Sequence, residues 1–342
     1  MPTHEPRQLV YLVYGGRAEY HQEAKYSILS ALHHASGQCP RILVYTDEPG
    51  QFAGWPVEVV GLDADTLTSW TGPVAYLHRR KAAAIRDALQ YAERSIFIDT
   101  DTFFLRSPVE LFERLAGADW LVDEIEGAWG ECDRDALLEI IGPYLVKQYG
   151  VDESMLLINS GVLGFQVDAS GLMDETLALI DLLHPMVPKV HTIEQFAVAV
   201  AAKNLGRPAE SRGVIKHYYS SKSYWRHMIS AFFERHGEAF TPQLVRVVPE
   251  LPSSKLRPPL LHRLVFRVRS IALPAKLRAQ AKLAYYAAVM RNTPYEQACA
   301  RAYAEELARK ALPEGESVEG QPWSKMLSDR QRQRLNELLL RG

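Results

Sequence analysis

The stretch that decides the fold runs from Arg94 to Phe104 and reads RSIFIDTDTFF. Its first half is a short apolar run, which is typical of a buried strand. The run ends in Asp99 and Asp101, and residues two apart on an extended chain face the same side. Two carboxylates held that close repel each other unless a cation lies between them or one takes up a proton. We therefore expect a ligand site at the carboxyl end of this strand, with Mg²⁺ or Mn²⁺ held by the two aspartates.

The Asp-x-Asp pattern occurs three times, and the surrounding sequence separates the copies. The copy at 63–65 follows a strand-like run and leads into polar sequence, so we expect a solvated loop there. The copy at 133–135 precedes an apolar helical run, where acidic residues suit a helix cap and first turn. Asp99 and Asp101 lie between two apolar runs, where carboxylates need a compensating partner. A simple turn at the end of the strand is the alternative to a metal site.

Length and composition bound the class of protein. The chain has 342 residues, enough for one large α/β domain with additions or for two domains. Hydrophobic residues make up 47% and charged residues 23%, ordinary values for a globular protein, and the net charge of −2 gives no support for a nucleic-acid partner. Cys39, Cys132 and Cys299 lack metal-ligand spacing and suggest unpaired thiols in a reducing compartment. No apolar run approaches the ~20 residues of a membrane span, and we expect a cytoplasmic protein.

Strand-like and helix-like stretches alternate through the first 250 residues. This alternation predicts an α/β fold with a Rossmann-like, mostly parallel sheet that carries helices on both faces. The expected strands are 8–14, 41–45, 57–60, 94–98 and 119–125, and the expected helices are 20–36, 74–91, 105–115, 133–149, 172–183 and 193–203. From about residue 251 prolines break the chain and a basic helical region begins. We expect a catalytic domain over 1–250 and a helical C-terminal extension over 251–342.

Two basic or polar segments are candidates for binding a metal and a phosphate. In the segment 215–225, His217 follows a short strand and could complete a metal shell, while Lys222 could neutralise phosphate charge. The alternative is a surface loop whose aromatic side chains cover an edge of the core. Arg79 to Lys81 lie one helix before the acidic strand and could reach a pyrophosphate, unless they form a solvated basic face.

Three other motifs have competing structural explanations. Asn159 to Gly161 separates two apolar runs, as a hairpin turn would. Thr192 with Gln195 three residues later fits a capping box, which competes with a catalytic role for Glu194 or Gln195. Gly15–Gly16 after the first strand permits the close approach of a ligand, but no G-x-G-x-x-G or Walker pattern follows.

Taken in order, these motifs resemble those of the GT-A-fold nucleotide-diphospho-sugar glycosyltransferases, nearest the glycogenin and lipopolysaccharide galactosyltransferase group. The resemblance covers about 9–225: a tyrosine-containing loop after strand one, an Arg/Lys helix, the Asp-Thr-Asp strand end, Asn-Ser-Gly, an acid-Gln pair and a histidine loop ending in tryptophan. The family's late motif resembles H-F-x-G-x-x-K-P-W, and His217 and Trp225 keep that spacing. Ser220 and Tyr224 replace its glycine and proline, and the lysine comes one place early.

The resemblance implies a GT-A fold and a glycosyltransferase that moves a sugar from a nucleotide-diphosphate donor, with UDP as carrier and retention of configuration, to a glycan or lipid-linked acceptor hydroxyl. It implies Mn²⁺ or Mg²⁺ bound by Asp99, Asp101 and His217, with Glu194 or Gln195 facing the reacting carbon of the sugar. Base-stacking, phosphate-binding and sugar-binding roles are implied for Tyr14, Gly15, Tyr20, Arg80, Lys81, Asn159, Ser160, Gly161, Lys222 and Trp225.

Two other functions remain open from the residues. A nucleotidyltransferase could use the same acidic pair, although it would favour a Gly-rich basic loop after strand one, which the sequence at 15–19 fits poorly. A non-catalytic nucleotide-sugar-binding protein is the other alternative, and the presence of all three candidate metal ligands argues against it.

The segment 255–310 interleaves lysines and arginines with apolar residues. This pattern is typical of a basic amphipathic helix at a membrane surface and would allow peripheral contact with the inner membrane face. The alternative is a helical cap whose apolar face packs on the catalytic domain.

Overall fold

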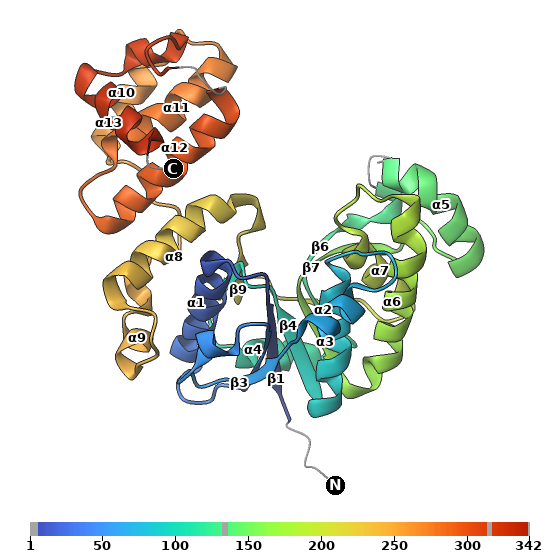
Figure 1. The fold of residues 1–342 in the computed structure, drawn as a ribbon. Helices are drawn as coiled ribbons and strands as arrows, with labels where there is room; N and C mark the ends of the chain where they lie inside the picture. The colour runs from blue at the N-terminus through green and yellow to red at the C-terminus, as the bar shows by residue number, and fades with distance from the viewer. Residues whose placement is uncertain (1–5, 132–135, 313–316, 341–342) are drawn as a thin grey trace. The chain divides into compact units, whose positions relative to one another are not determined.

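The computed structural model describes residues 6–131, 136–312 and 317–340, and it divides into two compact units. The first unit runs to His217 and takes in 239–245, while the second comprises 218–238 and the chain from Arg246 onward. Contacts thus group 218–238 with the C-terminal helices, whereas the sequence prediction placed the division near residue 250. The two units are described separately below (Figure 1).

The first unit is built on a mixed sheet of seven strands among the described residues, in the order β3-β2-β1-β4-β7-β6-β8. β1, β2, β3 and β4 are parallel, β7 runs antiparallel to both of its neighbours, and β5 and β9 form a separate antiparallel pair. The strands are β1 (Gln8–Val13), β2 (Arg41–Thr46), β3 (Glu58–Gly61), β4 (Arg94–Ile98), β5 (Thr102–Phe104), β6 (Leu121–Ala128), β7 (Leu156–Gln166), β8 (Ala209–Glu210) and β9 (Ile215–His217).

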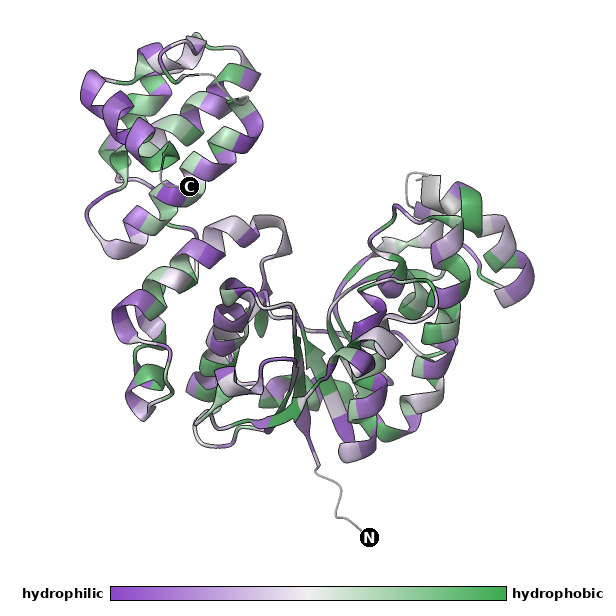
Figure 2. Ribbon diagram, in the orientation of Figure 1, coloured by the Kyte–Doolittle hydropathy of each residue, from purple (hydrophilic) through white to green (hydrophobic). Residues whose placement is uncertain are grey.

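Helices cover both faces of this sheet, as the sequence predicted (Figure 1). One face carries α1 (Ala18–His34) and α4 (Val109–Ala116), and the other carries α2 (Ala64–Thr71), α3 (Arg79–Ala88), α6 (Ser170–Leu183) and α7 (Ile193–Ala201). α5 (Ala136–Tyr149) connects β6 to β7. Because both faces are covered, neighbouring residues such as Leu9 and Val10 are both buried, and the strands read as continuous apolar runs (Figure 2).

Three segments of the first unit differ from the sequence prediction. The expected loop at 63–65 is wrong, because Asp63 caps α2 by accepting a hydrogen bond from the amide of Thr66. The hairpin turn considered for 159–161 is also wrong, since these residues lie inside β7. The helix expected from residue 74 begins at Arg79, after a bend at which Ala75 has a φ of 53°. The third Asp-x-Asp copy, at 133–135, lies outside the described residues.

The second unit is helical, as expected for the C-terminal region. It contains α8 (Lys222–His236), α10 (Leu260–Arg269), α11 (Ala275–Val289), α12 (Pro294–Ala311) and α13 (Asp329–Leu339), and α9 (Pro242–Arg246) lies where the chain passes between the units. Tyr224 joins α8 to α12, because its ring lies near that of Tyr303 and its hydroxyl lies 3.2 Å from the Cys299 sulfur. Cys39 and Cys299 are free thiols. In the described ranges, no helix is both long enough and apolar enough to cross a membrane.

Candidate metal and donor site

The strand order creates a crevice position at the carboxyl ends of β1 and β4. The chain proceeds outward from β1 through β2 to β3 and then returns to the other side of β1 as β4. The connections that leave the carboxyl ends of β1 and β4 therefore run in opposite directions. The crevice between two such connections is where open α/β sheets bind ligands. Tyr14 and Gly15 follow β1 at this point, and Asp99 follows β4.

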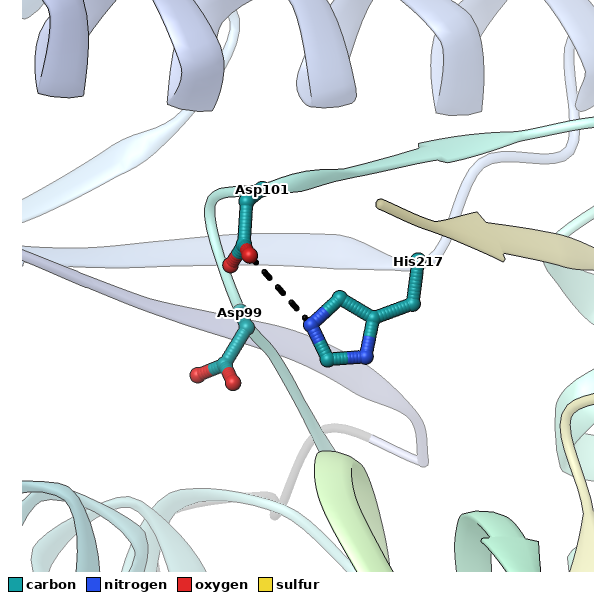
Figure 3. Close-up of side chains that lie close together, drawn as sticks. All are labelled: Asp99, Asp101 and His217. Carbon is teal, nitrogen blue, oxygen red and sulfur yellow. Dashed lines mark ion pairs between the residues drawn. The ribbon is translucent and has the colours of Figure 1, made fainter. Parts of the chain in front are cut away.

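Asp99, Asp101 and His217 meet at this position (Figure 3). Each offers one ligand atom, and the three atoms lie within 4.8 Å of one another. The aspartates come from the β4–β5 connection, while His217 ends β9, which pairs with β5 so that Thr102 lies opposite His217. The Nε2 atom of His217 lies 3.4 Å from a carboxylate oxygen of Asp101, and both side chains are more than 90% buried. The predicted trio is thus brought together from segments more than a hundred residues apart.

The second nitrogen of His217 is held by Asp123 on β6, at 2.7 Å from Nδ1. Asp123 also accepts a hydrogen bond from the Ser211 hydroxyl at 2.7 Å. Burial alone would lower the pKa of His217, but the hydrogen bonds to Asp101 and Asp123 outweigh it and raise the pKa to about 9. A histidine whose one nitrogen donates to a carboxylate and whose other faces an acidic group has the arrangement of a metal-binding imidazole. Sequence analysis missed Asp123.

Gly161 leaves the space that the imidazole of His217 occupies. A Cβ atom at residue 161 would lie 2.2 Å from the His217 Cε1 atom, far inside contact distance. The carbonyl oxygen of Gly161 also accepts a hydrogen bond of 2.8 Å from the amide of Asp99. The Asn-Ser-Gly motif therefore shapes the site through its backbone and its missing side chain.

Lys81 ties the acidic strand end to the interior. Its ammonium group lies 3.1 Å from Asp99 and from the Ser160 hydroxyl, and 4.0 Å from Glu194. Ser160 in turn donates to Glu194 at 3.0 Å. Burial opposes the charge of Lys81, but the neighbouring carboxylates outweigh it and raise its pKa, whereas burial raises the pKa of Glu194 despite the lysine. Lys81 is thus a buried cation that two carboxylates share.

Glu126 joins two other predicted residues. One of its oxygens accepts from the amide of Asn159 at 3.2 Å and the other accepts from the amide of Gln195 at 3.1 Å. The capping box considered for Thr192 is absent, since Thr192 makes no side-chain cap hydrogen bond at the start of α7. Gln195 instead extends to β6, and it is less buried than Glu194.

Tyr14 and Arg80 form the side of the site next to β1. The guanidinium of Arg80 lies 4.7 Å from the centre of the Tyr14 ring. Arg80 also donates to the Thr71 hydroxyl and the Leu67 carbonyl, so the structure orients it toward α2 and Tyr14 rather than toward the aspartates. The amide of Gly15 donates to Asp47.

Three further residues were predicted for the site. Tyr20 lies in α1 beside Arg17, whose guanidinium is 5.7 Å from the Tyr20 ring. Lys222 and Trp225 belong to the second unit, where Lys222 begins α8. Trp225 is fully buried against Tyr218 and Tyr224, so it serves the core of that unit. The segment 215–225, for which a surface loop was the alternative, is a short strand, a 3₁₀ turn and the start of a helix.

The donor set suits a hard divalent cation. Two carboxylates and an imidazole are ligands that Mn²⁺ and Mg²⁺ accept, and ligands on opposite sides of Mg²⁺ lie about 4.2 Å apart. The three donor atoms lie within 4.8 Å of one another, and the Asp101 and His217 donors, 3.4 Å apart, lie closer than that separation. Asp123 supplies the orienting carboxylate behind the histidine. The residues therefore fit the ion that the sequence suggested.

No protein-family model and no curated protein matches this sequence. Among solved structures, the chain is similar to mouse xyloside xylosyltransferase 1, at 15% identity over 58% of this chain and 82% of that chain, with a TM-score of 0.40. It is also similar to the galactosyltransferase LgtC, crystallised with donor and acceptor sugar analogs, at 10% identity over 75% of this chain and 99% of that chain, with a TM-score of 0.41. At this distance, likeness alone assigns no activity.

Proposed function

We propose that this chain is a metal-dependent glycosyltransferase that transfers a sugar from a nucleotide-diphosphate donor to an acceptor hydroxyl. The observation that carries the proposal is the cluster of Asp99, Asp101 and His217 beside the carboxyl ends of β1 and β4, with Asp123 behind the histidine. Bound Mn²⁺ or Mg²⁺ would neutralise charge on the departing diphosphate. The GT-A arrangement, UDP as the carrier and retention of configuration belong to this proposal through the resemblance of the motifs.

Different residues around the acidic pair would contact different parts of the nucleotide-sugar donor. Tyr14, with Arg80 against its ring, offers an aromatic face for the nucleotide base next to the end of β1. Gly15 has a φ of 99°, and a Cβ added there would meet no atom within 4 Å, which leaves room for a ligand close to the backbone. Lys81 is committed to Asp99, Ser160 and Glu194, so its role is to fix the acidic strand end rather than to reach a phosphate.

Of the two candidates for the residue near the reacting carbon, we propose Gln195. Glu194 is 5% exposed and engaged by Ser160, so it is a positioning residue for Lys81. The Gln195 amide is more accessible, and its contact with Glu126 leaves its carbonyl oxygen available to face a sugar. Glu126 and Asn159 would then orient Gln195 from β6 and β7.

The test is to incubate the purified protein with a panel of UDP-sugars and glycan or lipid-linked acceptors, with Mn²⁺ or with chelator, and to identify products by mass spectrometry. We expect transfer, or slow donor hydrolysis, that requires metal. Asp101→Asn should lower the rate by about 10²–10³-fold, since it removes one preorganised charge at the leaving group. Asp65→Asn, an exposed aspartate of another Asp-x-Asp copy, is the matched control and should be silent.

Three results would contradict the proposal. Full activity of Asp101→Asn in the presence of chelator would show that the reaction needs no metal. Release of pyrophosphate with a new nucleotide linkage would make the protein a nucleotidyltransferase instead. Metal-dependent nucleotide-sugar binding without turnover on any acceptor would favour a binding protein.

A further inference from the structure

α10 in the second unit exposes a continuous apolar arc. Leu261, Val268 and Ile271 are 70%, 72% and 78% exposed, and Leu260 and Leu264 are also exposed. Their spacing of three and four residues places them along one side of the helix and its C-terminal continuation. Scattered exposed apolar residues are ordinary, but a row of four on one helix side, with a fifth just beyond the helix end, marks an interaction surface.

The opposite side of α10 fixes the helix to the second unit. Phe266 is buried against the rings of Tyr285 and Tyr286 on α11. Arg269 donates to the Met326 carbonyl, and Arg278 closes the C-terminal end of α10 by donating to the carbonyls of 270, 271 and 273. The helix is therefore held with its apolar arc turned away from its own unit. One side of α11 and one side of α12, by contrast, are buried, and these two helices pack on each other within the second unit.

A strongly cationic hollow of about 820 Å³ adjoins the same helix. One carboxylate and six basic side chains line it. The basic residues are Lys255, Arg257, Arg263, Lys276, Lys282 and Lys310. The carboxylate, Glu306, is engaged by Lys310. Arg263 lies on α10 itself, so one helix contributes both to the hollow and to the apolar arc. Lys282 lies 5.5 Å from the centre of the Tyr286 ring, and both residues line the hollow.

We propose that α10 and this hollow form a docking surface for an anionic lipid bilayer. The apolar arc would enter the boundary between headgroups and acyl chains, and the cations would contact lipid phosphates. Charge complementarity selects the occupant, because six cations around one hollow favour a phosphate-rich surface, and the leucine, valine and isoleucine side chains need an apolar phase beside it. The surface is independent of the proposed catalytic activity, since all of its residues belong to the second unit.

The test is co-sedimentation of the full chain with phosphatidylcholine vesicles, with and without phosphatidylglycerol, at low and high salt. We expect binding to the anionic vesicles at low salt and several-fold weaker binding at high salt, because screening acts over about 10 Å at 0.1 M. Leu264→Asp with Val268→Asp should abolish measurable binding. Lys276→Glu with Lys282→Glu should weaken binding at least 25-fold, since each cation near the surface contributes about fivefold.

Matched control variants separate this surface from general effects of charge. Ile140→Asp with Val146→Asp alters two exposed apolar residues of α5 in the first unit, both 52% exposed. Lys147→Glu with Lys189→Glu makes the same charge change at exposed lysines there. Both pairs should bind anionic vesicles as the parent chain does. All the altered side chains of α10 and α5 are exposed, so thermal unfolding should be little changed.

Three outcomes would overturn the proposal. The first is an absence of sedimentation with anionic vesicles at low salt. The second is equal loss of binding in the control pairs, which would show a non-specific charge effect. The third is binding of inorganic pyrophosphate that Lys276→Glu removes, with no vesicle binding, since the hollow would then be a site for a soluble anion.

Discussion

The Nδ1 atom of His217 lies 2.7 Å from a carboxylate oxygen of Asp123, so the other ring nitrogen is directed at Asp101. Asp123 thereby fixes both the tautomer and the orientation of the imidazole, although it belongs to a different strand from every predicted ligand. The site therefore has four residues: three candidate metal ligands, and Asp123, which orients one of them, His217.

Asp123→Asn should weaken Mn²⁺ binding by about 10–100-fold, because the amide no longer favours the tautomer with a free Nε2 lone pair. Activity at saturating Mn²⁺ should fall much less. Isothermal titration with Mn²⁺, together with the metal dependence of transfer, measures both effects. Glu124→Gln, at the next residue and exposed beside Arg212, is the control. Equal losses in both variants would show that the effect is not specific to the histidine.

Metal affinity should rise with pH. The pKa of His217 is about 9 without metal, so the ion must displace a proton from the ring below that pH. The apparent affinity should therefore increase by up to about tenfold per pH unit and level off near pH 9. Without metal, the free energy of unfolding should change with pH in the opposite direction. The raised pKa of His217 stabilises the fold fully below pH 6.5, and this stabilisation is lost as the pH rises through 9. Mn²⁺ titrations from pH 6 upward, paired with urea unfolding in chelator, test both signs.

Gly161→Ala should displace the imidazole, since the new Cβ atom would lie 2.2 Å from the His217 ring. A shift of about 1 Å in a catalytic group can cost about 10² in rate, and we expect a loss of that order together with weaker Mn²⁺ binding. Gly171→Ala, in α6 with no atom within 4 Å of the added Cβ, should leave activity unchanged. Wild-type kinetics in Gly161→Ala would show that the ring has room to move.

Lys81→Met should destabilise the first unit by about 3–5 kcal/mol, because Glu194 and Asp99 lose the cation between them and Glu194 is buried. Adding Glu194→Gln should restore part of this loss, since the buried charge is then removed as well. Urea unfolding of the two single variants and the double variant measures the coupling between the two residues. Strict additivity would mean that the 4.0 Å pair contributes nothing to stability.

The sequence predicted much of this site because its strongest motif combines two independent signals. Asp99 and Asp101 end an apolar strand, and His217 follows a second short strand at the spacing of the family's late motif. Asp123 and Glu126 escaped prediction because β6 has register shifts between Val122 and Glu124 and again between Ile125 and Gly127. A strand interrupted in this way loses the strict alternation from which a sequence shows which side chains share a face.

Other differences arise from tertiary contacts that no local pattern contains. Asn159 to Gly161 has the composition of a turn, yet β4 and β6 pair on either side of β7 and keep it extended. The polar side chains there are satisfied by Glu126, Lys81 and Glu194. In the C-terminal region, composition indicated basic amphipathic helices but not which helix would remain uncovered. Only packing distinguishes α10 from α11 and α12 in the part of the chain that the structure describes.

The two compact units alternate along the chain, since 218–238 belong to the second unit and 239–245 return to the first. A single recombination crossover near residue 250 would therefore not exchange one unit for another. It would leave α8 without α12, exposing the side of Tyr224 that meets Cys299 and Tyr303. A new C-terminal unit would have to replace 218–238 as well as the chain from Arg246 onward.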